Sequence, residues 1–374
     1  MRTAIISDLH LGLASGGDVL RDPAVRSILL EEIAGADRVV LLGDVVELRE
    51  RSLGASLNLA RPFFEDLGAA LGKAEVTIVP GNHDHRFAEP LLDRLSLEGG
   101  TPLSLDDLQP PSDGPTAAIA EWLGPAKLEI AYPGLWLRDD VYATHGHYMD
   151  AHLSLPRAEC LAIATRMRIA GALPDPAAPA DYERLLLPLY GLFFGLAQVR
   201  RSAVARSQAR TSEAAWELLA GAEDDDSRGR RARMSAARAG FPVLVKAINR
   251  VLHAEFQADI SGPAIFHSGL VAATEMARRL GVDGAHVITG HSHRGGPIGE
   301  EAWPLPGGGS LHNTGSWVFA SIFHHPGHPP NPYWPGTVTW VEDDGPPRRV
   351  QLLLERSHSE LTELVERAKR SPAT

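Results

Sequence analysis

The stretch that decides the fold is Val76-Thr77-Ile78-Val79-Pro80-Gly81-Asn82-His83-Asp84. Its β-branched first half, closed by Pro-Gly, predicts a buried strand that ends in a loop at the rim of a sheet. That loop presents an amide, an imidazole and a carboxylate in succession. We therefore expect a sheet whose strand ends carry the chemistry of the protein.

Four other segments repeat this arrangement of an apolar strand followed by polar side chains. Asp8 and His10 follow residues 3–7, Asp44 follows residues 39–43, His145 follows residues 142–144, and His291 and His293 follow residues 287–290. With Asn82, these are seven oxygen and nitrogen donors without a thiolate, a set that suits Mn²⁺, Fe or Zn²⁺. Seven donors are too many for one tetrahedral zinc ion, but they fit two ions that share a bridging carboxylate, for which Asp44 is the candidate. Two such ions can hold a hydroxide and clamp the oxygens of a phosphoryl centre.

Strands and helices alternate in the first 80 residues, which predicts an α/β sheet with helices packed on its faces. The expected strands are residues 2–7, 38–42 and 75–79, and the expected helices are 23–34 and 57–71. Short strands around 127–132, 135–137 and 141–144 predict an antiparallel or mixed second half. Further strands are expected at residues 285–289, 310–313, 337–341 and 349–354.

The pattern changes between residues 151 and 280, where alanine, leucine and arginine dominate and the periodicity becomes helical. We expect a core formed by residues 1–150 and 281–356, a helical insert or cap at 151–280, and a C-terminal helix and tail at 357–374. Residues 222–233, rich in aspartate and then arginine, are expected to form an exposed loop. The apolar window 185–199 contains Pro188 and is shorter than the roughly 20 residues that span a bilayer. It predicts a buried helix or a lipid-facing cap rather than a membrane anchor.

The chain has 36 basic and 47 acidic residues, a net charge of −11 that argues against duplex nucleic acid as a partner. The insert, with 17 basic and 13 acidic residues, is the part expected to meet an anion, although a solvated helical surface explains this charge equally well. A single cysteine, Cys160, excludes an internal disulfide and indicates a reducing compartment, in which it is a small core residue. Because the first strand starts at residue 3, we expect no signal peptide and a cytoplasmic protein.

The polar blocks resemble the five ordered motifs of the calcineurin-like metallophosphoesterases. The blocks are Asp8-Leu9-His10, Gly43-Asp44, Gly81-Asn82-His83-Asp84, the segment of His145, and Gly290-His291-Ser292-His293. The resemblance covers about residues 1–150 and 283–354. It implies a four-layer α/β/β/α sandwich, with a large helical insert, and a dinuclear site at one sheet edge. One metal would take Asp8, His10, Asp44 and His293, and the other Asp44, Asn82, His145 and His291.

The same resemblance assigns roles beside the metals. His83 matches the family histidine that is not a ligand and can protonate the leaving oxygen, and Glu47 matches the acid that orients it. The arginine that follows this acid in protein phosphatases is Leu48 here, which argues against a protein phosphatase. Arg86 or Arg294 can supply the missing cation, unless they form surface ion pairs.

Further substrate contacts are expected from His147 and Asn313, for which loop packing and an ordinary turn are the alternatives. His324, His325 and His328 are expected to be surface histidines in a proline-rich loop. The blocks around Asp8, Asp44 and His291 also resemble the UDP-2,3-diacylglucosamine hydrolases, which carry arginine where this chain has His83.

These observations predict a phosphoesterase with two divalent ions, Mn²⁺ or else Fe or Zn²⁺. It would hydrolyse a small or amphipathic phosphomonoester, phosphodiester or pyrophosphate by direct attack of a metal-bridging hydroxide. One alternative is a nucleotide-sugar lipid pyrophosphatase of the UDP-2,3-diacylglucosamine type. Another is a binding scaffold without catalysis. The expected partner is a small or lipid-like organic phosphate, with peripheral membrane contact through the insert as an option; the oligomeric state is left open.

Overall fold

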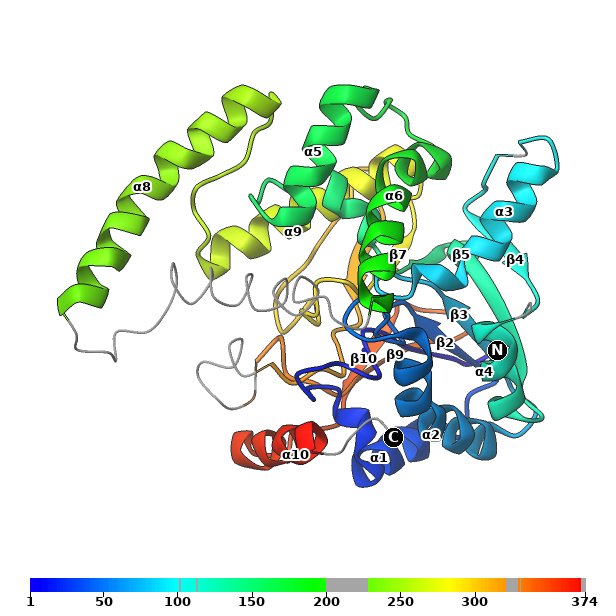
Figure 1. The fold of residues 1–374 in the computed structure, drawn as a ribbon. Helices are drawn as coiled ribbons and strands as arrows, with labels where there is room; N and C mark the ends of the chain where they lie inside the picture. Colours follow the sequence, from blue (N-terminus) through cyan, green and yellow to red (C-terminus); the bar gives the residue numbers. More distant parts are fainter. Residues whose placement is uncertain (101, 112–113, 200–227, 321–328, 330, 371–374) are drawn as a thin grey trace.

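The computed structural model describes residues 1–374 except 101, 112–113, 200–227, 321–328, 330 and 371–374. In the described residues, a mixed sheet of ten strands has helices on both sides (Figure 1). The α/β class predicted from the alternation of strands and helices is confirmed.

The strand order places the predicted polar loops near one another. The strands are β1 (Thr3–Ile6), β2 (Arg38–Leu42), β3 (Glu75–Val79), β4 (Asp106–Gln109), β5 (Lys127–Arg138), β6 (Val141–Thr144), β7 (His286–Thr289), β8 (Ser310–Asn313), β9 (Thr337–Val341) and β10 (Arg348–Gln351). They are ordered β10-β9-β1-β2-β3-β5-β6-β7-β8, and β4 pairs with β5. β1, β2 and β3 are parallel neighbours, and so are β6, β7 and β8. Parallel neighbours end at the same edge, so the residues that follow them gather there.

The sheet divides at β5 into two halves that pack face to face. The first part of β5 pairs with β3, whereas the part from Gly134 to Arg138 pairs with β6. One buried cluster joins side chains of both halves, namely Ile5, Val40, Leu42 and Val79 with Leu135, Val141, Ala143 and Ile288. Side chains point alternately to the two faces of a strand, so the neighbours of these residues face outward.

Helices cover both outer faces. α1 (Pro23–Ile33), α2 (Leu53–Leu71), α4 (Pro115–Leu123) and α10 (His358–Arg370) pack on the face that carries Ala4, Val39 and Ile78. α5 (Ala158–Ala170), α6 (Pro179–Gln198), α8 (Arg228–Leu252) and α9 (Gly262–Leu280) contribute to a cluster with Tyr142 and Val287 of the other half. The predicted four layers, α/β/β/α, are therefore present.

Four predicted element boundaries need correction, and one of them is the last strand, expected at 349–354, which covers Arg348–Gln351. The second helix begins at Leu53 rather than at residue 57. The two short strands expected at 127–132 and 135–137 form one strand, β5, which continues through Pro133 where it changes partners. The loop expected at 222–233 is wrong from Arg228 onward, because α8 starts there; residues 222–227 lie outside the described residues.

The insert expected at 151–280 contains α5, α6, α8 and α9, which lie between β6 and β7 (Figure 1). Cys160 is a free, buried cysteine in α5, and burial raises the pKa of its thiol, as fits a core residue. In α6, Leu185, Leu186 and Tyr190 are buried. Across the described part of the chain, none of the helices combines the length and the apolar character needed to cross a bilayer.

Candidate metal centre

The polar side chains predicted at five strand ends come together in the structure. Asp8, Asp44 and Asn82 follow β1, β2 and β3, and backbone hydrogen bonds join their loops. The N–H of Asp8 donates to Gly43 O at 3.0 Å, and that of His10 donates to Asp44 O at 2.8 Å. From the other half, the N–H of Gly290 donates to His145 O at 3.0 Å. The loops are thus fixed to one another before any side chain is considered.

The backbone at this edge adopts a conformation that costs free energy. Six described residues other than glycine have positive φ, and five of them belong to the predicted ligand set: Asp8 (54°), His10 (45°), Asp44 (51°), His291 (62°) and His293 (59°). Residues other than glycine seldom adopt a positive φ, because this conformation strains the backbone. Backbone strain of this kind is concentrated at functional sites. The concentration of strain therefore marks this edge of the sheet as the functional site.

Two glycines allow the loops to approach one another closely. A Cβ on Gly43 would lie 2.3 Å from the ring of His145, and one on Gly81 would lie 2.3 Å from Asp44 Oδ1. Gly43 also has a φ of 81°. Neither position can therefore hold a larger residue without displacing a candidate ligand.

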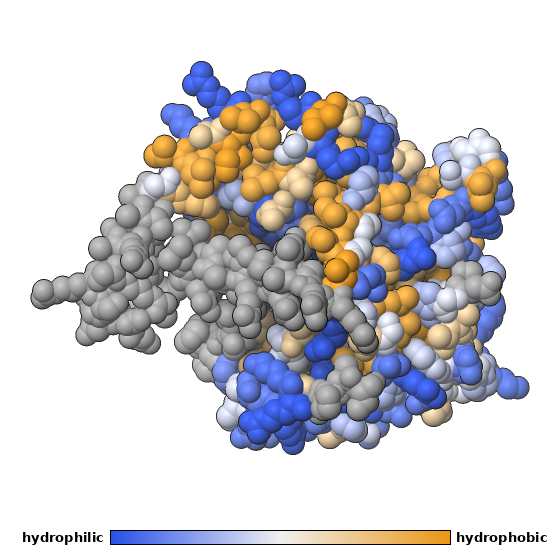
Figure 2. Space-filling view, in the orientation of Figure 1, coloured by the Kyte–Doolittle hydropathy of each residue, from blue (hydrophilic) through white to orange (hydrophobic). Residues whose placement is uncertain are grey.

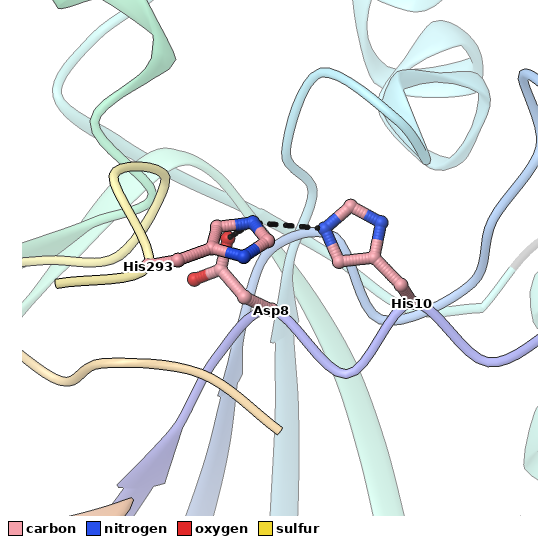
Figure 3. Close-up of side chains that lie close together, drawn as sticks. All are labelled: Asp8, His10 and His293. Atoms are coloured by element: carbon pink, nitrogen blue, oxygen red, sulfur yellow. Dashed lines mark hydrogen bonds and ion pairs between the residues drawn. The ribbon is translucent and has the colours of Figure 1, made fainter. Parts of the chain in front are cut away.

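Asp8, His10 and His293 form the first group of candidate ligands (Figure 3). His293 Nε2 lies 3.2 Å from Asp8 Oδ1 and 3.3 Å from His10 Nε2. Asp8 is fully buried, and among the described residues its Oδ1 has no well-aligned hydrogen bond, although His293 Nε2 lies 3.2 Å away. A buried carboxylate oxygen of this kind suits a cation as its partner.

Asp44, His145 and His291 form the second group, and Asn82 lies against it. Asp44 Oδ2 is 3.3 Å from His145 Nε2, while Asn82 Oδ1 is 3.3 Å from His145 Nε2 and 3.1 Å from His291 Nδ1. Asp44 also reaches the first group, because its Oδ2 is 3.5 Å from His10 Nε2. This places Asp44 between the two groups, as the predicted bridging role requires.

Hydrogen bonds set the orientation of three of the histidines. His10 Nδ1 donates to Glu47 at 2.9 Å, His145 Nδ1 donates to Leu42 O at 2.9 Å, and His291 Nε2 donates to Asp150 at 2.9 Å. In each case the other ring nitrogen then faces the other candidate ligands. Metal-binding histidines are normally held in this way. The donor set therefore fits two divalent ions, although nothing in it selects one metal.

The carboxylates of the centre raise the pKa values of two of its histidines. Burial opposes protonation of His10, but the hydrogen bond to Glu47 and the charge of Asp44 raise its pKa to about 9. Burial likewise opposes protonation of His145, while Asp44 raises its pKa to about 10. Protons and metal ions compete for the same nitrogens, so metal affinity should fall as the pH falls.

Glu47 connects the ligand group to the candidate acid. Its Oε2 lies 2.6 Å from His83 Nδ1 and 2.9 Å from His10 Nδ1. Burial alone would raise the pKa of this carboxyl, but His83 and His10 hold it below its ordinary value. Burial lowers the pKa of His83, against the opposing effect of Glu47 and Asp44. The sequence anticipated the contact of Glu47 with His83 but not the contact with His10.

Two other carboxylates hold the centre in place. Asp84 is fully buried and accepts hydrogen bonds from the backbone N–H groups of Gly81 (2.6 Å) and Val45 (2.7 Å), which joins the β2 and β3 loops. Burial and the neighbouring Asp44 raise the pKa of Asp84 to about 6. Asp150 orients His291, a role that the sequence did not assign to it.

The four predicted substrate contacts each have a partner within the protein. Arg86 forms an ion pair with Glu89, and Arg294 forms one with Glu301 at 2.6 Å. Asn313 donates to Gly290 O at 2.5 Å and Ser292 Oγ at 3.0 Å, so it holds the loop that carries His291. His147 is 1% exposed, and burial holds its pKa well below the ordinary value. Neither Asn313 nor His147 presents a free surface to substrate. The histidines at 324, 325 and 328 lie outside the described residues.

A buried polar network from the insert lies next to His145, and no local pattern predicts it. Glu183 of α6 accepts hydrogen bonds from Tyr132 (2.5 Å) and Tyr148 (2.6 Å). Tyr132 is also 3.2 Å from His147 Nε2, and the His147 and His145 rings are 5.6 Å apart. One end of α6 is thereby anchored to the core behind the centre.

The arginine that sequence reasoning missed is Arg49. Its side chain is 10% exposed, and its Nη1 lies 2.9 Å from the Asn82 amide. It directly follows Leu48, the residue that stands where the protein phosphatases carry an arginine. No local signal distinguishes it from a surface arginine, because its partners are distant in the sequence.

Fold and donor set together define the class, an α/β protein with a candidate metal centre of carboxylate, amide and imidazole groups at strand ends. Residues 1–162 match the model of the calcineurin-like phosphoesterase family, and this match supports the assignment to that superfamily. The match includes Asp8, His10, Asp44, Asn82 and His145, whereas His291 and His293 follow it. Comparison with curated proteins gave no match.

Proposed function

We propose that this protein hydrolyses a small or amphipathic organic phosphate with two divalent metal ions. The observation that carries the proposal is the convergence of the seven predicted donors from five strand ends into overlapping groups joined by His10 and Asp44, one of which, His10, Asp44 and His83, also includes the candidate acid. Asp8, His10, Asp44 and His293 would hold one ion, and Asp44, Asn82, His145 and His291 the other. When bound, two such ions supply an activated water and neutralise charge on a phosphoryl group.

The residues of the chain itself supply proton transfer and orientation. His83 is 24% exposed at its side chain, so it is open to a substrate, unlike the fully buried Glu47 beside it. With Nδ1 donating to Glu47, His83 would have to be in its imidazolium form, which the charges of Glu47 and Asp44 favour, for its Nε2–H to give a proton to the leaving oxygen. Proton transfer by a positioned histidine contributes about 10²–10⁴ in rate.

The test is hydrolysis of two reporters by metal-free protein to which Mn²⁺, Zn²⁺ or Fe²⁺ is restored. Bis-p-nitrophenyl phosphate reports diesterase activity, and p-nitrophenyl phosphate reports monoesterase activity. We expect turnover of at least one reporter, and about two metal ions per chain by elemental analysis. If neither reporter is hydrolysed with any of these metals, and no metal is retained, the proposal fails.

An amphipathic substrate presented at a membrane surface, such as a nucleotide-sugar lipid, is the second candidate. It is favoured by apolar residues exposed on α8, where Val243 is 70% exposed, Leu244 56% and Val251 71%. Figure 2 shows hydrophobic residues gathered over the insert helices, in the upper part of the view. α8 contains seven basic and no acidic residues, which complements anionic lipid. This candidate predicts that vesicles raise the rate on a lipid-linked pyrophosphate but not on a soluble reporter.

A further inference from the structure

A second cluster of imidazole groups lies at the opposite edge of the sheet from the candidate metal centre. His286 is the first residue of β7, and Ser310 and His312 are the first and third residues of β8. The candidate metal centre lies beyond the other ends of these strands, where His291 follows β7. Because a strand rises about 3.3 Å per residue, the five residues from His286 to His291 separate the two places by roughly 15 Å.

The parallel pairing of β7 and β8 brings the side chains of the cluster to one face. His286 is paired with Ser310, and Ile288 is paired with His312. Side chains alternate between the two faces of a strand, so all four point to the same side. Ile288 belongs to the buried cluster between the two halves of the sheet. The two histidines therefore lie at the border of that cluster, where both are partly exposed.

Three polar atoms of these side chains converge. His286 Nδ1 lies 2.6 Å from Ser310 Oγ, and Ser310 Oγ lies 2.9 Å from His312 Nε2. The two nitrogens are 3.3 Å apart, and the centroids of the two rings are 5.4 Å apart in an edge-to-face arrangement. Each ring thus directs a nitrogen at the same small volume, with the hydroxyl beside it.

The distance between the two nitrogens matches the requirement of a tetrahedral metal ion. Zinc–nitrogen bonds are about 2.0–2.1 Å long, and two such bonds at the tetrahedral angle place their nitrogens roughly 3.3 Å apart. Burial and the neighbouring His286 lower the pKa of His312 to about 4, so the ring of His312 is neutral at neutral pH. A neutral imidazole keeps one nitrogen without a proton, and that nitrogen can bind a metal.

We propose that His286 and His312 bind a transition-metal ion of the Zn²⁺, Cu²⁺ or Ni²⁺ class, with Ser310 Oγ and water completing its coordination. Imidazole nitrogen suits these ions, whereas Mg²⁺, Ca²⁺ and Mn²⁺ favour oxygen ligands. The described residues place no carboxylate within ligand distance of both nitrogens. The nearby Asp140, whose backbone oxygen accepts from the N–H of His286, has its carboxylate paired with Arg138. The site therefore differs in selectivity from the candidate metal centre, where carboxylates also suit Mn²⁺.

An ion at this site would join two neighbouring strands that both hold the candidate metal centre. β7 leads into the loop of His291, and Asn313 at the end of β8 donates to Gly290 O of that loop at 2.5 Å. An ion that binds the folded chain and not the unfolded one stabilises the fold by mass action. The role inferred for this site is therefore structural, and it does not depend on hydrolysis of a phosphate ester.

The experiment counts metal ions per chain in the full-length protein by equilibrium dialysis and elemental analysis, with Mn²⁺ and with Zn²⁺. Mn²⁺ should fill the candidate metal centre alone, whereas Zn²⁺ should add one further ion per chain. His286→Ala and His312→Ala should each lose that additional zinc ion and keep the wild-type Mn²⁺ content and reporter rates. His267→Ala, which removes an exposed histidine of α9, is the matched control and should keep the additional ion.

Two substitutions of Ser310 distinguish a metal site from a set of hydrogen bonds that only holds the strands together. Ser310→Ala removes the hydroxyl and keeps both nitrogens, so the additional zinc ion should remain bound. Ser310→Cys introduces a thiolate, a strong zinc ligand, and should tighten zinc binding at least about 10-fold. Because it tests the site by a gain of affinity, Ser310→Cys decides the outcome if a histidine variant fails to fold.

Equal zinc content in the wild type, His286→Ala and His312→Ala would overturn the proposal. A zinc affinity that Ser310→Cys leaves unchanged would overturn it as well. The proposed function is tested separately, because Asp44→Asn impairs the candidate metal centre and should keep the additional zinc ion. A wild-type protein that hydrolyses neither reporter but holds this ion through His286 and His312 would contradict the proposed function alone.

Discussion

The strand-end loops of the core and the helices of the insert are built in opposite ways. At the strand ends, polar side chains are buried and their orientation is fixed by partners such as Glu47, Asp84 and Asp150. On α8, apolar side chains such as Val243 and Val251 are exposed. Burial of charge and exposure of apolar surface both cost free energy. Because the chain has both buried charges and exposed apolar side chains, we infer that each of these features serves binding.

We infer from this difference that the core carries the chemistry and that the insert chooses the substrate. Substitutions at the strand ends should then reduce the rate on every phosphate ester. Substitutions on the outer face of the insert should leave small reporters unaffected.

Asp44→Asn should have the largest effect, because the side chain is placed between both ligand groups. Loss of its charge should remove at least one metal, and with it several kcal/mol of transition-state stabilisation, on the order of 10³ in rate. Rates on both reporters and elemental analysis measure the two consequences. Asp66→Asn is the control, since Asp66 is a half-exposed carboxylate paired with Arg26. Two bound metals and a wild-type rate in Asp44→Asn would remove the basis for a dinuclear centre.

His83→Ala should lower kcat by about 10²–10⁴ and leave both metals bound. The reason is that His83 contacts Glu47 and lies outside the predicted ligand set. The loss should shrink with reporters whose leaving group needs no proton, which a comparison of leaving groups of different pKa measures. His267→Ala, an exposed histidine of α9, is the control. Full function after His83→Ala would instead favour the scaffold hypothesis.

The sequence indicated the strand ends of the core well, because each is a local pattern of a β-branched run followed by polar residues. It also indicated the contact of Glu47 with His83. It could not indicate the left-handed backbone at Asp8 or Asp44, since glycine is the usual signal for positive φ and neither is glycine. Such strain is maintained by the surrounding loops, which are assembled from distant segments.

Contacts between the insert and the core were beyond sequence reasoning for the same reason. Glu159 meets Arg49 across 110 residues, and Glu183 meets Tyr132 across 51. Local patterns also misled at two points. Pro133 suggested a break in a strand that in fact continues. The arginines after residue 227 suggested a loop, although alanine, arginine and methionine favour a helix.

Asp150→Ala should have a smaller effect than the two preceding substitutions. Removal of the acceptor for His291 Nε2 frees the ring to rotate and change tautomer, which typically lowers metal affinity about 10- to 100-fold. Titration of Mn²⁺ against a competing chelator measures this loss. Asp150→Asn keeps a neutral acceptor and should lose less. If both variants bind Mn²⁺ as tightly as the wild type, His291 is not held as a ligand by Asp150.

Leu244→Asp should have the smallest effect on hydrolysis, because Leu244 is on the exposed face of α8. The adjacent face, with Val245, packs in the insert cluster. We expect unchanged rates on soluble reporters and a change in unfolding free energy within about 0.5 kcal/mol. Binding to vesicles that contain anionic lipid, measured by sedimentation, should fall, and high salt should weaken binding of the wild type in the same assay.

Leu97→Asp is the matched control for this substitution, since Leu97 is 87% exposed at the end of α3 (Glu89–Leu97), outside the insert. The same substitution there should leave vesicle binding unchanged. If the wild type does not sediment with anionic vesicles but elutes as a dimer that Leu244→Asp dissociates, a second copy of the chain covers α8. The exposed apolar face would then serve assembly, and substrate choice would have to depend on the inner contacts of the insert with Arg49.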